Sequence, residues 1–136
     1  MTMESIIVTK IYFDGSTTQT ACVIAGKRTN SLEIKLLERK VTSNEGEYYA
    51  LIRALVRAKK RRLTSIQVLG DSELIIRQMN GVYRVKKKEL ETLCKYAQAL
   101  ASDFKSITFT WVSRNDNLAG HLLERNVTSK EIKLLD

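Results

Sequence analysis

The hydrophobic pattern changes its period near residue 44, and this change constrains the fold more than any other feature of the chain. Before this point, apolar residues form three short strand-like runs, over residues 5–13, 20–26 and 32–41. In the third run, three apolar side chains alternate and are expected to point inward: Leu32, Ile34 and Leu36. Short polar turns join the runs, so we expect three antiparallel strands connected as hairpins.

From Asn44 onward, apolar residues recur at the spacing of an amphipathic helix: Tyr48, Leu51, Ile52 and Leu55. Further strands are expected over 65–70 and 106–112. Further helices are expected from Ser72 to before Gly81, over 88–102 and 116–125, and at the capping-box sequence TSKE of residues 128–131. Strands separated by helices are usually parallel. The pattern therefore predicts an α/β fold in one domain over 1–136. Its mixed five-stranded sheet has three antiparallel strands first, strands one, four and five parallel, and helices on both faces.

The composition favours a polyanionic partner. The net charge is +8, and the positive charge is concentrated in RAKKRR (57–62) and RVKKKE (84–89). Such runs bind phosphates but also occur at solvated helix ends, so both interpretations stay open. No apolar run approaches the roughly 18–20 residues of a membrane span, and the N-terminus does not resemble a signal peptide. We expect a cytoplasmic protein without a membrane partner, with Cys22 and Cys94 as buried free thiols.

Three acidic residues stand where strands or helices meet the predicted sheet edge. Asp14 ends the first strand, Asp71 ends the fourth, and Glu47 lies early in the first helix. Taken one at a time, each acid has a simpler explanation. Asp14 is then a turn residue, and Glu47 is the partner of Asn44 in a capping box. Asp71 then stabilises the start of the following helix. Together they would repel one another unless a cation is bound, and oxygen ligands suit Mg²⁺ or Mn²⁺. In a basic protein, two such ions point to phosphodiester chemistry.

Four sequence blocks resemble the motifs of type 1 ribonuclease H, in the family's order and at similar spacing, from about residue 6 to 125. They are IYFDGS, TSNEGEYYALIRAL, GDSELIIRQMNGVYRVKKKEL and WVSRNDNLAGHLLE. The resemblance implies the ribonuclease H-like fold. It also implies metal-dependent hydrolysis of the RNA strand of an RNA/DNA hybrid by a two-metal-ion mechanism, leaving 5′-phosphate and 3′-hydroxyl ends. It suggests a role in removing primers or R-loops, and we expect a monomer.

The same resemblance assigns roles to individual residues. Asp14, Glu47 and Asp71 match the family's metal-binding and catalytic carboxylates. Contacts to the nucleic acid are expected from these residues: Gly15, Ser16, Asn44, Ser72, Lys86, Lys87 and Lys88. The segment GVYRVKKKEL resembles the version of the family that lacks an extra basic helix, which the lysines partly replace.

The fourth block departs from the family pattern, because His121 stands where an aspartate usually binds one metal. We interpret His121 as a fourth catalytic and metal-binding residue. A neutral imidazole there would lower the formal charge of the site from −4 to −3 and favour Mn²⁺ relative to Mg²⁺. The separate loop histidine of many family members is absent, because His121 is the only histidine. The alternative is an impaired member that binds hybrid or double-stranded nucleic acid without cleaving it. A nuclease of the same fold acting on structured DNA is a third possibility.

Overall fold

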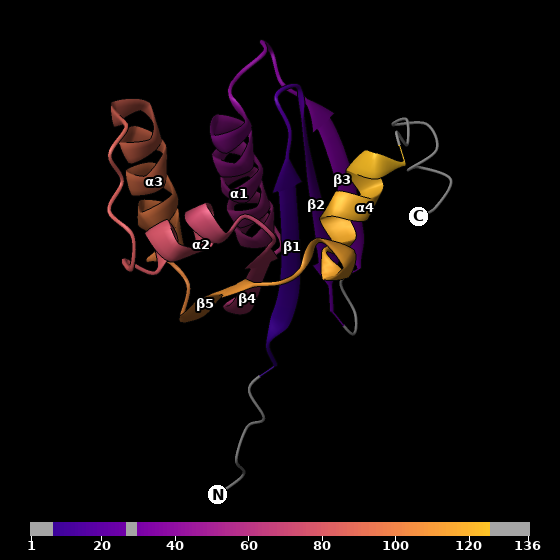
Figure 1. The fold of residues 1–136 in the computed structure, drawn as a ribbon. Helices are drawn as coiled ribbons and strands as arrows, with labels where there is room; N and C mark the ends of the chain where they lie inside the picture. Colours follow the sequence, from indigo (N-terminus) through magenta and orange to yellow (C-terminus); the bar gives the residue numbers. More distant parts are fainter. Residues whose placement is uncertain (1–6, 27–29, 126–136) are drawn as a thin grey trace, which may run out of the picture.

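The computed structural model describes residues 7–26 and 30–125 and contains one five-stranded sheet (Figure 1). Its strands are β1 (Thr9–Gly15), β2 (Gln19–Ala25), β3 (Ser31–Leu36), β4 (Ser65–Gly70) and β5 (Ser106–Trp111). They lie in the order β3-β2-β1-β4-β5. The first three strands are antiparallel, and β4 is parallel to both β1 and β5, so the predicted mixed sheet is confirmed.

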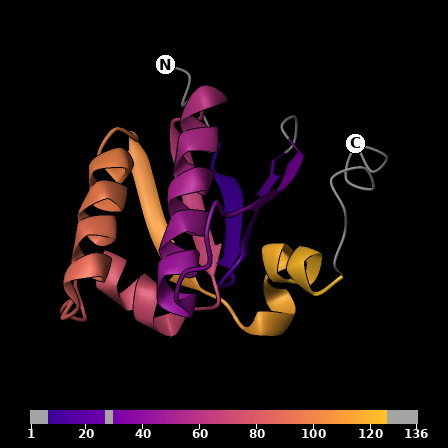
Figure 2. The same cartoon turned by 90° about the horizontal axis from the view of Figure 1, so that it is seen from above.

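Helices pack on both faces of this sheet, as predicted. They are α1 (Ser43–Lys60), α2 (Glu73–Met79), α3 (Lys88–Ala101), the 3₁₀ turn η1 (Arg114–Asp116) and α4 (Leu118–Glu124). The larger core lies between the sheet and α1 to α3, around Phe13, Tyr48 and Leu51, which are fully buried. A smaller core lies under α4, where Ala119 and Leu122 pack on β2. Figure 2 shows α4 apart from the other helices.

The largest difference from the sequence prediction is the third strand, which ends at Leu36 rather than at residue 41. Leu32 and Ile34 pack against the small core under α4, but the Leu36 side chain is 72% exposed. The expected alternation fails there because β3 is an edge strand. Cys22 and Cys94 are buried free thiols, as expected. The helix predicted at 128–131 lies outside the described residues. Among the described helices, none has the length and apolar character needed to cross a membrane.

Candidate metal centre and nucleic-acid groove

The sheet register places Asp14 and Asp71 side by side. The parallel pairing of β1 with β4 runs from Thr9 opposite Ile66 to Tyr12 opposite Leu69. Asp14 and Asp71 therefore occupy equivalent positions, two residues beyond the last pair. Ligand sites of open α/β sheets gather at these carboxyl ends of parallel strands. Together with Glu47, each residue offers a carboxylate oxygen within 4.8 Å of the others. The predicted convergence of the three acids is confirmed.

Two glycines bring Glu47 to this sheet edge. A Cβ on Gly15 would lie 2.0 Å from the Gly46 carbonyl oxygen, and a Cβ on Gly46 would lie 1.9 Å from that of Ser16. The end of β1 and the start of α1 thus touch backbone to backbone, which only glycine permits. The Gly15 N–H donates to Glu47 Oε1 at 2.7 Å.

The start of α1 leaves Glu47 free for the site. Thr42 is the N-cap and forms a capping box with Glu45: the Glu45 N–H donates to Thr42 Oγ1, and the Thr42 N–H donates to Glu45 Oε1. The alternative in which Glu47 caps the helix with Asn44 is therefore wrong. Because the cap lies two residues earlier, Glu47 faces the sheet instead of the helix end.

The carboxyl groups of Asp14 and Glu47 are buried at a high electrostatic cost. Burial, together with the neighbouring Asp14, raises the pKa of Glu47 to about 9. Burial also raises the pKa of Asp14, while a hydrogen bond that a protonated Glu47 can donate to Asp14 opposes this shift. When Glu47 is ionised, its buried Oε2 has no hydrogen-bond partner among the described residues. A buried oxygen without a donor usually calls for a water or an ion.

The donor set of this group fits a divalent cation. It consists of carboxylate oxygens only, which suit hard ions such as Mg²⁺ or Mn²⁺. A cation would also offset the burial and the repulsion that raise the pKa of Glu47, because it favours the charged form of each acid. Asp14, Glu47 and Asp71 are the residues that would hold such an ion.

Asn117 and Arg114 both contact Asp71, and the sequence reasoning did not select either as a site residue. The Asn117 side chain is fully buried; its Nδ2 donates to the Phe13 carbonyl oxygen at 3.0 Å and to Asp71 Oδ1 at 3.4 Å. Its Oδ1 accepts from the Ala119 N–H and caps α4. Arg114 Nη1 lies 3.5 Å from Asp71 Oδ2. The signal for Asn117 was its place four residues before His121 in the fourth block.

His121 is not part of the acidic group. Its Nε2 lies 2.7 Å from the Asn115 carbonyl oxygen, and its Nδ1 lies 4.0 Å from Glu124 Oε2. Gly120 is the residue of α4 that lies against Asp14: a Cβ there would be 3.5 Å from Asp14 Oδ2. The role of His121 as a metal ligand stays a prediction.

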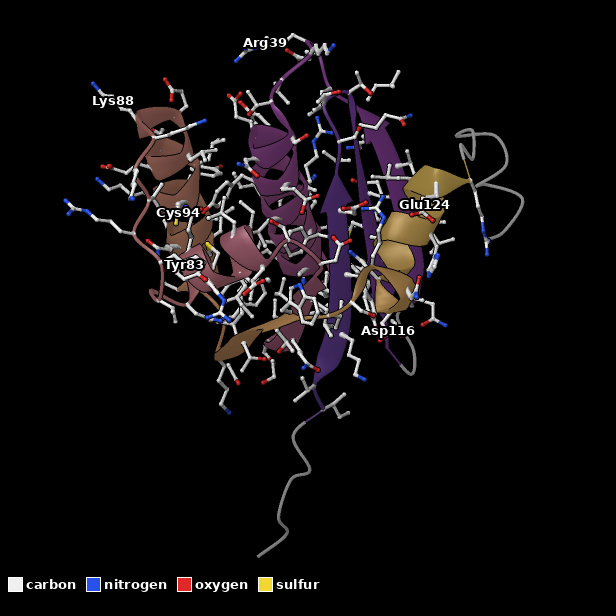
Figure 3. The ribbon with its side chains drawn as sticks, viewed as in Figure 1. Arg39, Tyr83, Lys88, Cys94, Asp116 and Glu124 are labelled. Atoms are coloured by element: carbon white, nitrogen blue, oxygen red, sulfur yellow. The ribbon has the colours of Figure 1, made fainter. Side chains whose placement is uncertain are left out.

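A cleft of about 600 Å³ contains the three acids. Of the predicted nucleic-acid contacts, Gly15, Ser16 and Ser72 line it. Ser72 is also the N-cap of α2, which the sequence predicted. Glu124 from the end of α4 lines the same cleft, and Figure 3 shows its carboxylate on α4. The sequence reasoning missed Glu124, because the family pattern of the fourth block assigns no role to its position.

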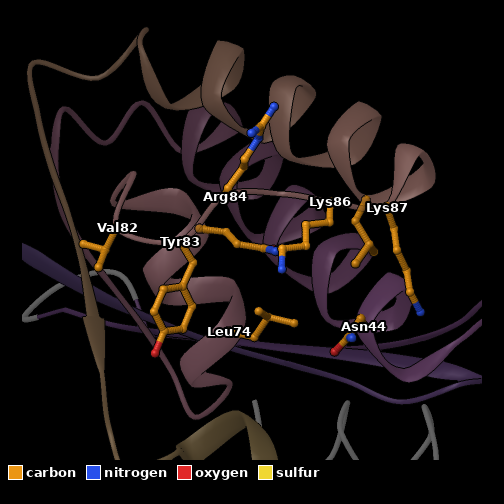
Figure 4. Close-up of a pocket in the computed structure, with 9 residues that line it drawn as sticks. Asn44, Leu74, Val82, Tyr83, Arg84, Lys86 and Lys87 are labelled. Carbon is orange, nitrogen blue, oxygen red and sulfur yellow. The ribbon is translucent and has the colours of Figure 1, made fainter.

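Asn44, Lys86 and Lys87 line a second groove of about 430 Å³, with Tyr83 and Arg84. In the view of Figure 4, Tyr83 lies at one end of the groove and Asn44 with Lys87 at the other. The Arg77 guanidinium stacks on the Tyr83 ring at 5.1 Å from its centroid. Lys88, the first residue of α3, is exposed and is not among the residues that line this groove.

Comparisons with known proteins agree with this geometry. The family model described as reverse transcriptase-like matches residues 14–126. A segment of 78 residues is 44% identical to the bifunctional protein Rv2228c of Mycobacterium tuberculosis and covers 57% of this chain. It covers only 21% of that longer protein. A second match, at 32% identity, is ribonuclease HI of Halobacterium salinarum, with 57% of this chain and 39% of that protein covered.

Solved structures extend the similarity to most of the chain. The N-terminal RNase H domain of Rv2228c superposes with a TM-score of 0.78 at 30% identity, over 88% of this chain and 96% of that one. RNase H1 of Halobacterium salinarum superposes with a TM-score of 0.78 at 25% identity, and the match covers 85% of this chain and 92% of that one. LC11-RNase H1, solved in complex with an RNA/DNA hybrid, superposes with a TM-score of 0.75 at 28% identity. The match covers 94% of this chain and 99% of that one. The chain therefore belongs to the ribonuclease H family.

Proposed function

We propose that this protein is an endoribonuclease that hydrolyses the RNA strand of RNA/DNA hybrids with two divalent ions, Mg²⁺ or Mn²⁺, leaving 5′-phosphate and 3′-hydroxyl ends. The observation that carries the proposal is the group formed by Asp14, Glu47 and Asp71, with its buried unpartnered oxygen, in an open cleft. The hybrid bound to LC11-RNase H1, a structural neighbour, supports the choice of substrate.

The three carboxylates would hold the ions. Divalent ions in such a site lower the pKa of a bound water and neutralise charge on a phosphodiester. Asp14 and Glu47 are fixed by the Gly15–Gly46 contact and the hydrogen bond from the Gly15 N–H, so they need little reorganisation. Asn117 donates to Asp71 and orients that carboxylate toward the group. The burial of Asp14 and Glu47 also keeps competing water away from their charged oxygens.

The groove beside α2 and α3 would bind the backbone of the hybrid. Lys86, Lys87 and Arg84 supply positive charge there, and Tyr83 supplies a flat surface against which a sugar or base can pack. In this proposal Gly15, Ser16, Asn44, Ser72 and Lys88 make the remaining backbone contacts. The net charge of +8 adds a long-range attraction to a polyanion.

The test is cleavage of an end-labelled RNA/DNA hybrid, with single-stranded RNA, double-stranded RNA and structured DNA as competing substrates. The wild type is expected to cut only the RNA strand of the hybrid, and only with a divalent ion. Asp14→Asn and Asp71→Asn should each lower the rate by at least about 100-fold. Asp116→Asn is the matched control, because it neutralises an exposed acid outside the three-acid group. Near wild-type cleavage by both site variants would contradict the proposal.

A second candidate is binding of hybrid or double-stranded nucleic acid without cleavage. The observation that favours it is the position of His121, which lies outside the acidic group, so only three acids converge there. The same assay separates the two functions, since a non-cleaving protein would shift the labelled hybrid in a gel but leave both strands intact with Mg²⁺ and with Mn²⁺.

A further inference from the structure

One face of α4 points at the acidic site, and it carries a carboxylate that the family pattern does not place there. Asn117 and Gly120 are three residues apart, and both lie against the site: Asn117 contacts Asp71, and Gly120 lies beside Asp14. Glu124 follows four residues after Gly120, which puts it on the same helical face. It lines the acidic cleft, whereas His121 does not.

Arg114 joins Glu124 to Asp71, while Glu124, like His121, lies outside the group of three acids whose oxygens fall within 4.8 Å of one another. Arg114 Nε donates to Glu124 Oε1 at 2.9 Å, and Nη1 of the same guanidinium lies 3.5 Å from Asp71 Oδ2. The hydrogen bond to Glu124 raises the pKa of Arg114, and the charges of Asp14 and Asp71 raise it further. The two carboxylates of Asp71 and Glu124 are thus separated by the width of one guanidinium. A positive charge already stands between them.

The orphaned oxygen of Glu47 gives independent reason to expect an ion in this cleft. Glu47 is buried to more than nine-tenths, and its Oε2 has no hydrogen-bond donor among the described residues. Arg114 does not satisfy it, because the guanidinium contacts Asp71 and Glu124 instead. A divalent ion bound deeper in the site would satisfy this oxygen when Glu47 is ionised.

We propose that Glu124 is the fourth carboxylate of the metal site, one helical turn after the position where the family carries its aspartate. Arg114 is a positioning residue that holds Glu124 at the cleft and balances its charge until a divalent ion binds. The inference rests on the proposed metal-dependent function and assigns this role to Glu124 rather than to His121. The His121 ring is already engaged by the Asn115 carbonyl oxygen and lies beside Glu124, not beside Asp14.

The test is Mn²⁺ binding to the full chain, measured by calorimetry without nucleic acid. Glu124→Gln is expected to weaken Mn²⁺ binding by about tenfold, because it removes one charge next to the ion. Arg114→Met should strengthen it by a few-fold, because a competing positive charge is lost. Asp116→Asn is the matched control for the loss of one exposed acid, and it should leave the affinity unchanged. His121→Ala should also bind like the wild type.

A double variant separates a direct role of Glu124 from one exerted through Arg114. If Glu124 acts on the ion, Glu124→Gln weakens Mn²⁺ binding by a similar factor in the Arg114→Met background. The inference is overturned if the effect vanishes there, if Glu124→Gln binds as tightly as the wild type, or if His121→Ala is the variant that loses affinity. A wild type that binds no Mn²⁺ would instead overturn the proposed function itself. The exposed positions of Glu124 and Arg114 make misfolding a small risk, and circular dichroism of each variant checks it.

Discussion

The two sides of the acidic site are built in opposite ways. On the inner side, Asp14 and Glu47 are 5% and 7% exposed and are held by a backbone contact between β1 and α1. On the outer side, the side chains of Arg114 and Glu124 are 65% and 49% exposed, and they meet through an ion pair. The inner side is fixed by the fold, whereas the outer side depends on side chains that can be exchanged at little cost to the fold.

This difference explains where the chain departs from its family. A change on the inner side would disturb the main core, because Phe13 and Tyr48, which flank Asp14 and Glu47 in the sequence, are fully buried. A change at position 121 disturbs little, since the His121 side chain is 39% exposed. An unusual residue in the fourth block therefore leaves the three-acid group intact.

The largest expected effect is a pH dependence of stability that comes from the inner side. In metal-free protein the pKa of Glu47 is raised from 4.5 to about 9, so the folded state binds more protons than the unfolded state between these values. Stability should therefore fall as pH rises through this window, by up to roughly 4 kcal/mol between pH 5 and 8. Urea unfolding in EDTA measures this loss, and Glu47→Gln should remove most of it.

Glu45→Gln is the control, two residues away on the same helix. The hydrogen bonds from Thr42 lower the pKa of Glu45, so its ionised form stabilises the fold at high pH, opposite in sign to Glu47. This variant should keep the fall in stability with rising pH. Adding Mn²⁺ to the wild type should reduce that fall, because an ion favours the ionised acids. An unchanged pH profile in Glu47→Gln would show that the inner side is not strained.

The second prediction compares a glycine from each side. Gly46→Ala should destabilise the protein by about 3 kcal/mol, because the new Cβ meets the Ser16 carbonyl oxygen and the backbone of β1 must move. Gly120→Ala adds the same methyl group on α4, where Asp14 Oδ2 is at an ordinary 3.5 Å. It should be neutral or stabilise by up to about 1 kcal/mol. Urea unfolding of both variants at pH 5.5 tests this contrast. An equal loss of unfolding free energy in the two variants would refute it.

Much of the inner side was predictable from the sequence, for a physical reason. Strand order and register follow from apolar patterns and from the rule that helix-linked strands run parallel, so the convergence of Asp14 and Asp71 could be inferred. The mutual contact of Gly15 and Gly46 could not, because it depends on how closely two backbones approach. The edge strand β3 was predicted five residues too long, since the apolar pattern continues where no partner covers it.

The outer side was less predictable because side-chain direction decides it. Alignment of motifs placed His121 at the site, whereas the helical face of α4 presents Gly120 and Glu124. The roles of Arg114 and Asn117 depend on contacts with Asp71, 43 and 46 residues earlier in the chain. No periodicity in a single sequence reports such contacts.

The third prediction concerns Asn117, which ties the two sides together. Asn117→Ala removes the donor to the Phe13 carbonyl oxygen and to Asp71, and it also removes the cap of α4. We expect a loss of about 2 kcal/mol, since a buried carbonyl loses its partner and the helix loses its cap. Ser72→Ala is the comparison, since it removes only a 3.4 Å capping bond on α2 and should cost under about 1 kcal/mol. If thermal unfolding shows the same loss of stability in Asn117→Ala and Ser72→Ala, Asn117 acts as a cap alone.

The smallest expected effect comes from His121→Asp, which places the family's usual residue on the outer side. The side chain is partly exposed, so the free energy of unfolding should change by less than about 0.5 kcal/mol. If Glu124 is the fourth carboxylate, the new acid adds only a neighbouring charge, and Mg²⁺-supported cleavage should rise about threefold relative to Mn²⁺-supported cleavage. If position 121 is itself the ligand, the same ratio should rise by at least about 100-fold, because a carboxylate then replaces an imidazole on the ion. Hybrid cleavage by wild type and variant in each metal distinguishes a ligand at position 121 from one at position 124.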